Sequence, residues 1–164
     1  AGGVDHIGAG LIAKAAGVDP TKINYIAYSG GGEALAAILG SQVTVGISSY
    51  GEFQAQVAAG ALRLLAVSSA ERIAGADAPT LKESGLDVVL QNWRMVAAAP
   101  GLTDEQKAAI SADVEKLVKS AGWQETLKTK NWQDTYLAGA AFEEQLAKDI
   151  AATETILKDI GLVK

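Results

Sequence analysis

Along the first hundred residues, apolar positions fall into two kinds of run. Runs rich in β-branched residues are typical of buried strands, and they occur at 22–28, 43–49, 62–68 and 87–98. Runs that look helical and end in glycine, the residue usual just past a helix C-terminus, occur at 4–17, 32–40, 51–60 and 78–85. Their alternation predicts an α/β fold with a mostly parallel sheet and flanking helices.

The last third of the chain is more polar and has the periodicity of long helices. Thr103 and Gln106 have the spacing of a capping box at a helix start, with Leu102 ahead of them. Apolar residues then recur on one helical face at 110, 114, 117 and 118, and on another at 142, 146, 150 and 157. We therefore expect two long amphipathic helices, over 102–122 and 140–161, that need a sheet face to bury against.

Composition narrows the possible partners. Hydrophobic residues make up 49% and charged residues 20% of the 164 residues, so we expect a folded core. The net charge of −5 argues against a nucleic-acid partner, and the absence of cysteine excludes disulfides. No apolar run is long enough to span a membrane. The N-terminal residues lack the features of a signal peptide, so we expect the chain to begin at a processing or truncation point.

Residues that could carry chemistry are few. The single histidine, His6, follows Asp5, but adjacent helix positions point in different directions and do not form an orienting pair. The sequence contains no HExxH, GxSxG or P-loop pattern, and Gly30–Gly32 do not satisfy GxGxxG. We therefore predict a protein that is not an enzyme, with no catalytic residues, no metal ligands and no cofactor.

Two glycine stretches, Gly2–Gly3 and Gly30–Gly32, each come directly before a predicted helix. A helix N-terminus offers unpaired N–H groups and a partial positive charge, and glycine lets an anion approach that backbone closely. Such turns lie at the carboxyl ends of strands, where ligands collect in α/β folds. Spacing alone favours the plainer alternative, that these glycines only turn the chain, and both readings stay open.

A third glycine turn carries hydroxyl groups. Ser48, Ser49 and Tyr50 follow a predicted strand, and hydroxyls can donate hydrogen bonds to a carboxylate. The alternative is that the two serines only cap the next helix. Tyr28 comes just before the second glycine turn, where its ring either borders a pocket or belongs to the core.

The order of these motifs resembles the substrate-binding proteins of tripartite tricarboxylate transporters, the Bug-type family. Each motif is weak alone, but the ordered set covers nearly the whole chain. Ser48–Ser49 and Glu33 differ from the residues common in the family at those positions. The matching elements are His6 near a helix start, Tyr28-x-Gly30-Gly31, Leu39-Gly40-x-Gln42-Val43, Ala59-Gly60-x-Leu62-Arg63, Leu65-Ala66-Val67-x-Ser69 with Arg72, Pro79-Thr80-x-x-Glu83-x-Gly85, and Trp93.

The resemblance implies a periplasmic protein with the two-lobed, type II solute-binding fold, of which this chain is the C-terminal half. Residues 1–98 would form the second lobe, and 99–164 a strand and helices that return to the first lobe. The implied ligand is a small organic carboxylate held between the lobes, and the implied partners are membrane permease subunits. The implied ligand-binding residues are Gly2, Gly3, Asp5, His6, Tyr28, Ser29, Gly30, Gly31, Gly32, Ser48, Ser49 and Tyr50.

Two other functions remain possible on the sequence alone. A small α/β phosphate- or nucleotide-binding domain, or an enzyme, would place phosphate at Gly30–Gly32, although no basic residue lies near that turn in the sequence. A sensor or receptor ectodomain would reuse the solute-binding fold and would need a membrane segment outside this chain.

Overall fold

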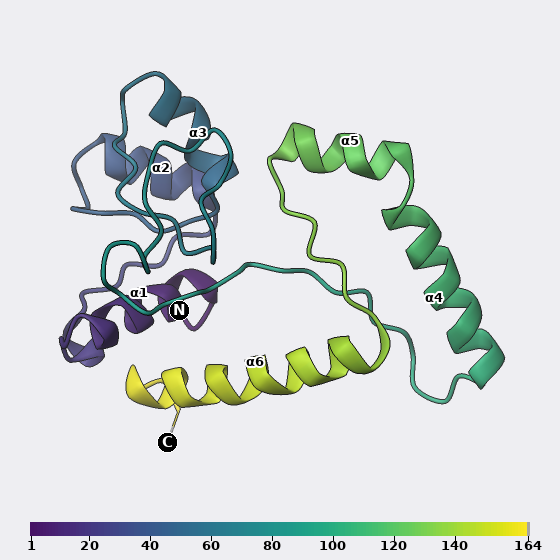
Figure 1. Ribbon diagram of the computed structural model, residues 1–164. Coiled ribbons are helices and arrows are strands. Elements are labelled where there is room, and N and C mark those ends of the chain that lie inside the picture. The colour runs from purple at the N-terminus through teal and green to yellow at the C-terminus, as the bar shows by residue number, and fades with distance from the viewer. Residues whose placement is uncertain (164) are drawn as a thin grey trace. The chain divides into compact units, whose positions relative to one another are not determined.

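The computed structural model describes residues 1–163, which form two compact units (Figure 1). The first unit comprises Ala1–Asn92 and the end of the chain from Asp149 onward. The second comprises Trp93–Lys148. The predicted boundary between lobes, at residue 98, concerns a larger two-lobed protein and stays a prediction.

Helices dominate the first unit. They are α1 (Val4–Ala15), the short 3₁₀ helix η1 (Pro20–Lys22), α2 (Gly31–Leu39), α3 (Tyr50–Ala58) and the last part of α6 (Gly139–Asp159). Helix α1 contacts η1, and α2 contacts α3. Gly17 and Gly60, just past α1 and α3, have φ of 73°, so the predicted glycine stops of these helices are confirmed.

The end of the chain packs against α1. Ile156 is 2% exposed and Ile160 is 8% exposed, and both lie beside Gly10 of α1. Lys14 of the same helix forms an ion pair with Asp159 at 2.5 Å. The packed residues differ from the apolar stripe predicted at 142, 146, 150 and 157, on which Ile150 is 51% exposed.

The predicted mostly parallel sheet is wrong. Among residues 1–163 the ladder pairing is limited to one isolated parallel bridge between Val67 and Thr80. Val67 donates its N–H to the carbonyl of Pro79 at 2.9 Å and accepts one from Leu81 at 2.9 Å. The runs at 22–28, 43–49 and 87–98 contain no regular strand. The helix predicted at 78–85 is also wrong, because residues 81–85 form a turn.

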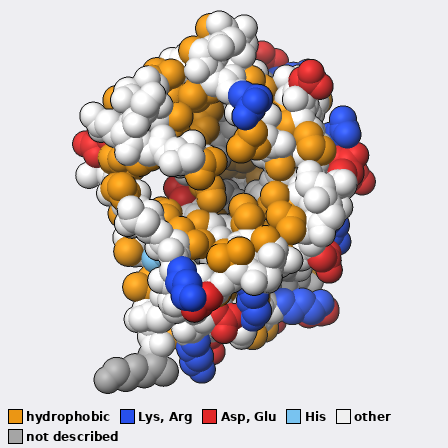
Figure 2. All heavy atoms as spheres, turned by 90° about the vertical axis from the view of Figure 1, so that its left-hand side faces the viewer, with side chains coloured by type: hydrophobic (Ala, Val, Ile, Leu, Met, Phe, Trp, Pro, Cys, Tyr) orange, Lys and Arg blue, Asp and Glu red, His pale blue; other side chains and the backbone are white. Residues whose placement is uncertain are grey.

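The extended runs of the first unit lie beside a cavity rather than beside partner strands. The apolar runs at 43–49 and 62–68 border a cavity of 720 Å³, which α1, α2 and α3 also line. Val45 and Leu65 on these runs remain 59% and 56% exposed. Figure 2 shows this hollowed face with hydrophobic side chains around the opening. β-Branched composition favours extended backbone, but a ladder also requires a second strand about 4.8 Å away, and composition does not specify it.

The second unit contains α4 (Asp104–Val118), α5 (Ala121–Lys130) and the first part of α6. The predicted capping box of α4 is confirmed, because Thr103 Oγ1 accepts from Gln106 N at 3.2 Å and Thr103 N donates to Gln106 Oε1 at 2.9 Å. The single helix predicted over 102–122 is interrupted, since Ser120 caps a new helix by accepting from the N–H of Trp123.

Candidate functional site

The first glycine turn holds the only histidine in place at the start of α1. Gly2 adopts φ of 82° and donates its N–H to His6 Nδ1 at 3.1 Å. The imidazole ring stacks on the ring of Tyr25, with centroids 4.0 Å apart and planes 9° apart. Nδ1 must be unprotonated to accept a hydrogen bond, so this arrangement favours neutral His6.

The electrostatics of this turn agree with its geometry. Burial lowers the pKa of His6, and the positive N-terminal amino group lowers it further. Burial raises the pKa of Asp5, and the negative charge of Glu52 adds to the rise. Burial also raises the pKa of Tyr25, with a further contribution from Asp5. Asp5 is therefore linked electrostatically to both Glu52 and Tyr25.

The second glycine turn leaves the start of α2 accessible. Gly30 is the N-cap in extended backbone, and the first helical hydrogen bond is donated by the N–H of Ala34. The N–H groups before Ala34 therefore have no partner within the helix. A Cβ added at Gly30 or Gly32 would meet nothing within 4 Å. Glu33 reaches back to accept the N–H of Ser29 at 3.1 Å, so its side chain supports the turn.

The third turn uses its hydroxyls within the protein. Ser49 is the N-cap of α3, but its side chain makes no capping hydrogen bond and instead accepts from Asn92 Nδ2 at 3.4 Å. Ser48 donates its hydroxyl to Glu52 Oε2. The Tyr50 hydroxyl donates to the carbonyl of Gly75 at 3.0 Å. Neither serine side chain therefore makes a capping hydrogen bond to the helix backbone, so the alternative in which both serines only cap the helix is wrong.

Glu52, in the first turn of α3, contacts the second and third turns. Its carboxylate lies against the backbone of Gly31, where a Cβ would be only 2.8 Å from Oε1 and closer to other atoms of the carboxylate. The same carboxylate accepts a hydrogen bond from the Ser48 hydroxyl, and its negative charge raises the pKa of Asp5. The structure thus places one acidic side chain between the starts of α2 and α3, and its charge raises the pKa of Asp5 in α1. Tyr28 is half-buried next to the second turn, and Gly3 makes no close contact at its Cβ position.

Glu52 and Tyr25 are the residues that sequence reasoning missed. Ser49-x-x-Glu52 has the spacing of a capping box, so a signal for Glu52 was present in the sequence. The hydroxyl that contacts Glu52 belongs to Ser48 instead. Tyr25 stacks on a ring 19 positions earlier, and no local pattern indicates such a contact.

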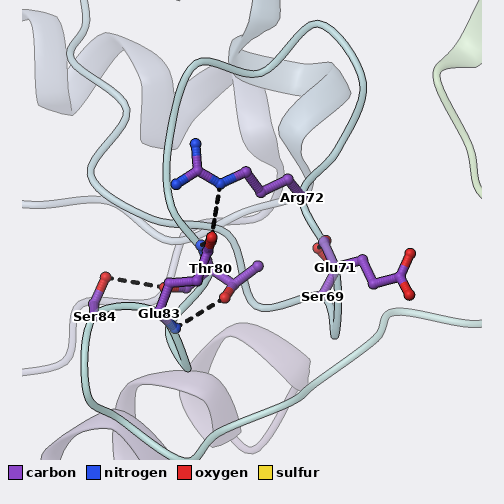
Figure 3. A network of polar contacts seen from close by, with 6 residues as sticks. All are labelled: Ser69, Glu71, Arg72, Thr80, Glu83 and Ser84. Carbon is purple, nitrogen blue, oxygen red and sulfur yellow. Dashed lines mark hydrogen bonds and ion pairs between the residues drawn. The ribbon is translucent and has the colours of Figure 1, made fainter.

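A separate polar network fixes the loop that carries the Pro79–Gly85 motif (Figure 3). Glu83 accepts from Arg72 Nε at 2.9 and 3.0 Å and from the N–H of Thr80 at 2.7 Å. Thr80 Oγ1 accepts the N–H of Glu83 at 3.0 Å, and the Ser84 hydroxyl donates to the Thr80 carbonyl at 2.9 Å. The hydrogen bond from Thr80 and the Arg72 charge lower the pKa of Glu83. These polar groups satisfy one another, so this motif is structural.

Neither a cluster of metal ligands nor a membrane-spanning helix is found within residues 1–163. No group of three or more His, Cys, Asp or Glu side chains is placed to hold a metal ion. None of the helices in this range has the length and apolarity needed to cross a membrane.

A family model described as the tripartite tricarboxylate transporter family receptor, TctC, matches residues 1–162. The chain belongs to this receptor family. The match confirms the resemblance seen in the motif order and agrees with the prediction that the protein is not an enzyme. A search of curated proteins gave no match.

Two solved structures are similar to this receptor-family chain. One is a TctC solute binding protein from Polaromonas, solved with no ligand, at 29% identity and a TM-score of 0.76. The other is Rpa4515 from R. palustris, solved with adipate, at 22% identity and a TM-score of 0.78. They cover 95% and 96% of this chain, and the chain covers 54% and 52% of theirs. The path of the chain thus follows the fold of these proteins, and it spans about half of their length.

Proposed function

We propose that this chain contributes one side of a periplasmic site for a small organic carboxylate, and that the protein delivers its solute to membrane permease subunits. In this proposal residues 1–98 belong to the second lobe of a solute-binding fold, and 99–164 return to the first. Membership of the receptor family supports the class of function. The adipate in the R. palustris structure supports a dicarboxylate of about that size.

The observation that carries the proposal for this chain is the open glycine start of α2. The N–H groups ahead of Ala34 are free of helical partners, and Gly30 and Gly32 have open space at their Cβ positions. A carboxylate there would receive backbone hydrogen bonds and the favourable end of the helix dipole. The start of α3 borders the same place, because Glu52 in its first turn lies against Gly31, and the charge of Glu52 raises the pKa of Asp5 near the start of α1.

Thermal-shift measurements on the 164-residue chain test this proposal. We expect C4–C6 dicarboxylates to raise the melting temperature, at matched ionic strength set with sodium chloride. Ligand at ten times its Kd should stabilise the fold by about 1.4 kcal/mol, or about 3–6 °C. If no carboxylate changes the melting temperature and a neutral sugar clearly raises it, the proposal is contradicted.

A matched pair of variants separates specific binding from general salt effects. Gly32 and Gly122 each occupy the second position of a helix, α2 and α5, and each has open space at its Cβ position. Gly32→Asp places a negative charge at the proposed site and should abolish the shift. Gly122→Asp makes the same change of charge elsewhere and should preserve it.

A further inference from the structure

The carboxylate of Glu52 lies beside the start of α2, next to the place proposed for the solute. It sits against the backbone of Gly31, the first residue of α2, at a distance that only glycine permits. Gly30 and Gly32 on either side have open space at their Cβ positions. Of the three glycines, Gly31 is therefore the one whose lack of a side chain makes room for an acidic group of the protein itself.

Glu52 is positioned by its neighbours. The Ser48 hydroxyl, one turn earlier at the start of α3, donates a hydrogen bond to Oε2. This bond fixes the carboxylate on the side of α3 that faces α2, and these two helices are in contact. A negative group beside a helix start is itself stabilised there by the dipole.

The position of Glu52 has a consequence for other anions. The charge of Glu52 contributes to the raised pKa of Asp5, for which burial is the larger cause. Glu33 adds a third carboxylate in the first turn of α2. A solute carboxylate arriving at Gly31 would meet both the bulk and the charge of Glu52.

We propose that Glu52 is an internal competitor that occupies the start of α2 and must turn away before a solute carboxylate binds there. This proposal rests on the proposed function and concerns the control of the same site. Glu52 sets how tightly, and for which anions, the site binds. Solutes with enough binding energy to displace it are retained, and weakly bound inorganic anions are rejected.

An NMR titration of the 164-residue chain with adipate tests this inference. Glu52→Gln removes the charge and keeps the shape and the acceptor for Ser48. We expect adipate to bind this variant about tenfold more tightly than the wild type. Glu105→Gln is the control, because Glu105 is an exposed acidic residue in the first turn of α4. It makes the same change in net charge and should leave the affinity unchanged.

Each outcome bears on one of the two proposals. Tighter binding by Glu52→Gln alone, or binding by this variant when the wild type shows none, supports the competitor role. Equal affinity for all three proteins, or weaker binding by Glu52→Gln, overturns the competitor role and leaves the carboxylate function in place. Absence of binding by all three, with melting curves that show folded protein, overturns both. Glu52→Ala provides a second variant that should also bind more tightly.

Discussion

Gly10 of α1 lies so close to Ile160 that a Cβ at this glycine would be 2.5 Å from Ile160 Cγ2. Ile156 Cδ1 would be 3.3 Å away from the same Cβ. Both isoleucines are buried, and Gly10 is buried within its helix. The end of the chain therefore packs on α1 through a position where only hydrogen fits.

Gly10→Ala should destabilise the first unit. Alanine in a helix normally gains up to about 1 kcal/mol over glycine. Overpacking at Ile160 should outweigh this gain and lower the free energy of unfolding by about 1–3 kcal/mol. Urea denaturation followed by circular dichroism measures the difference. Gly122→Ala is the control, because its Cβ meets open space and the substitution should be stabilising. Equal stabilisation by both substitutions would contradict the packing described for Gly10.

His6 should titrate below its ordinary pKa of 6.5, because burial and the N-terminal amino group disfavour its charged form. The unfolded chain then binds more protons than the folded one between the two pKa values, so stability should fall as the pH drops below 6.5. NMR titration of the imidazole protons measures the pKa without ambiguity, since the sequence has one histidine. Tyr25→Ala exposes the ring and should return the pKa toward 6.5, whereas Tyr136→Ala should not. A wild-type pKa at or above 6.5 would contradict the buried, stacked arrangement.

Glu83 should stabilise the loop it shares with Arg72 only while it is ionised. Its pKa is lowered from 4.5, mainly by the N–H of Thr80 and then by Arg72, so its contribution is present above pH 4.5. The contribution is lost as the pH falls through the lowered pKa. Glu83→Gln should therefore melt at a lower temperature than the wild type at pH 7, and the difference in melting temperature should narrow as the pH falls below 4.5. Glu125→Gln, at an exposed position of α5, serves as the control. A difference in melting temperature that stays constant with pH would show that the charge of Glu83 does not stabilise the loop.

Local signals predicted the helices, and non-local pairing explains the error in the sheet. Thr103 and Gln106 mark the start of α4 because capping depends on residues three positions apart. The strand runs at 43–49 and 62–68 have the right composition, yet a ladder depends on a partner far away in the sequence. Val45 and Leu65 face a cavity instead. Only the bridge between Val67 and Thr80 forms in the described residues.

In the candidate site too, local features were predictable from the sequence and long-range contacts were not. Glycines ahead of helices are visible in the sequence, so Gly30–Gly32 and Gly2–Gly3 were predictable as helix starts. The position of Glu52 between the starts of α2 and α3 depends on how these two helices pack, and composition does not encode that packing. The sequence pattern places Tyr25 in a predicted strand, whereas its ring stacks on His6.

The most direct test of the central claim is an NMR titration of the ¹⁵N-labelled chain with adipate, read at individual backbone amides. If the start of α2 binds a carboxylate, the amide signals of Gly30, Gly31 and Gly32 should shift and saturate, and Gly32→Asp should remove the effect. Signals from α4 and α5 should stay fixed. Shifts confined to α4 and α5, or no saturable shift at the three glycines, would contradict the account.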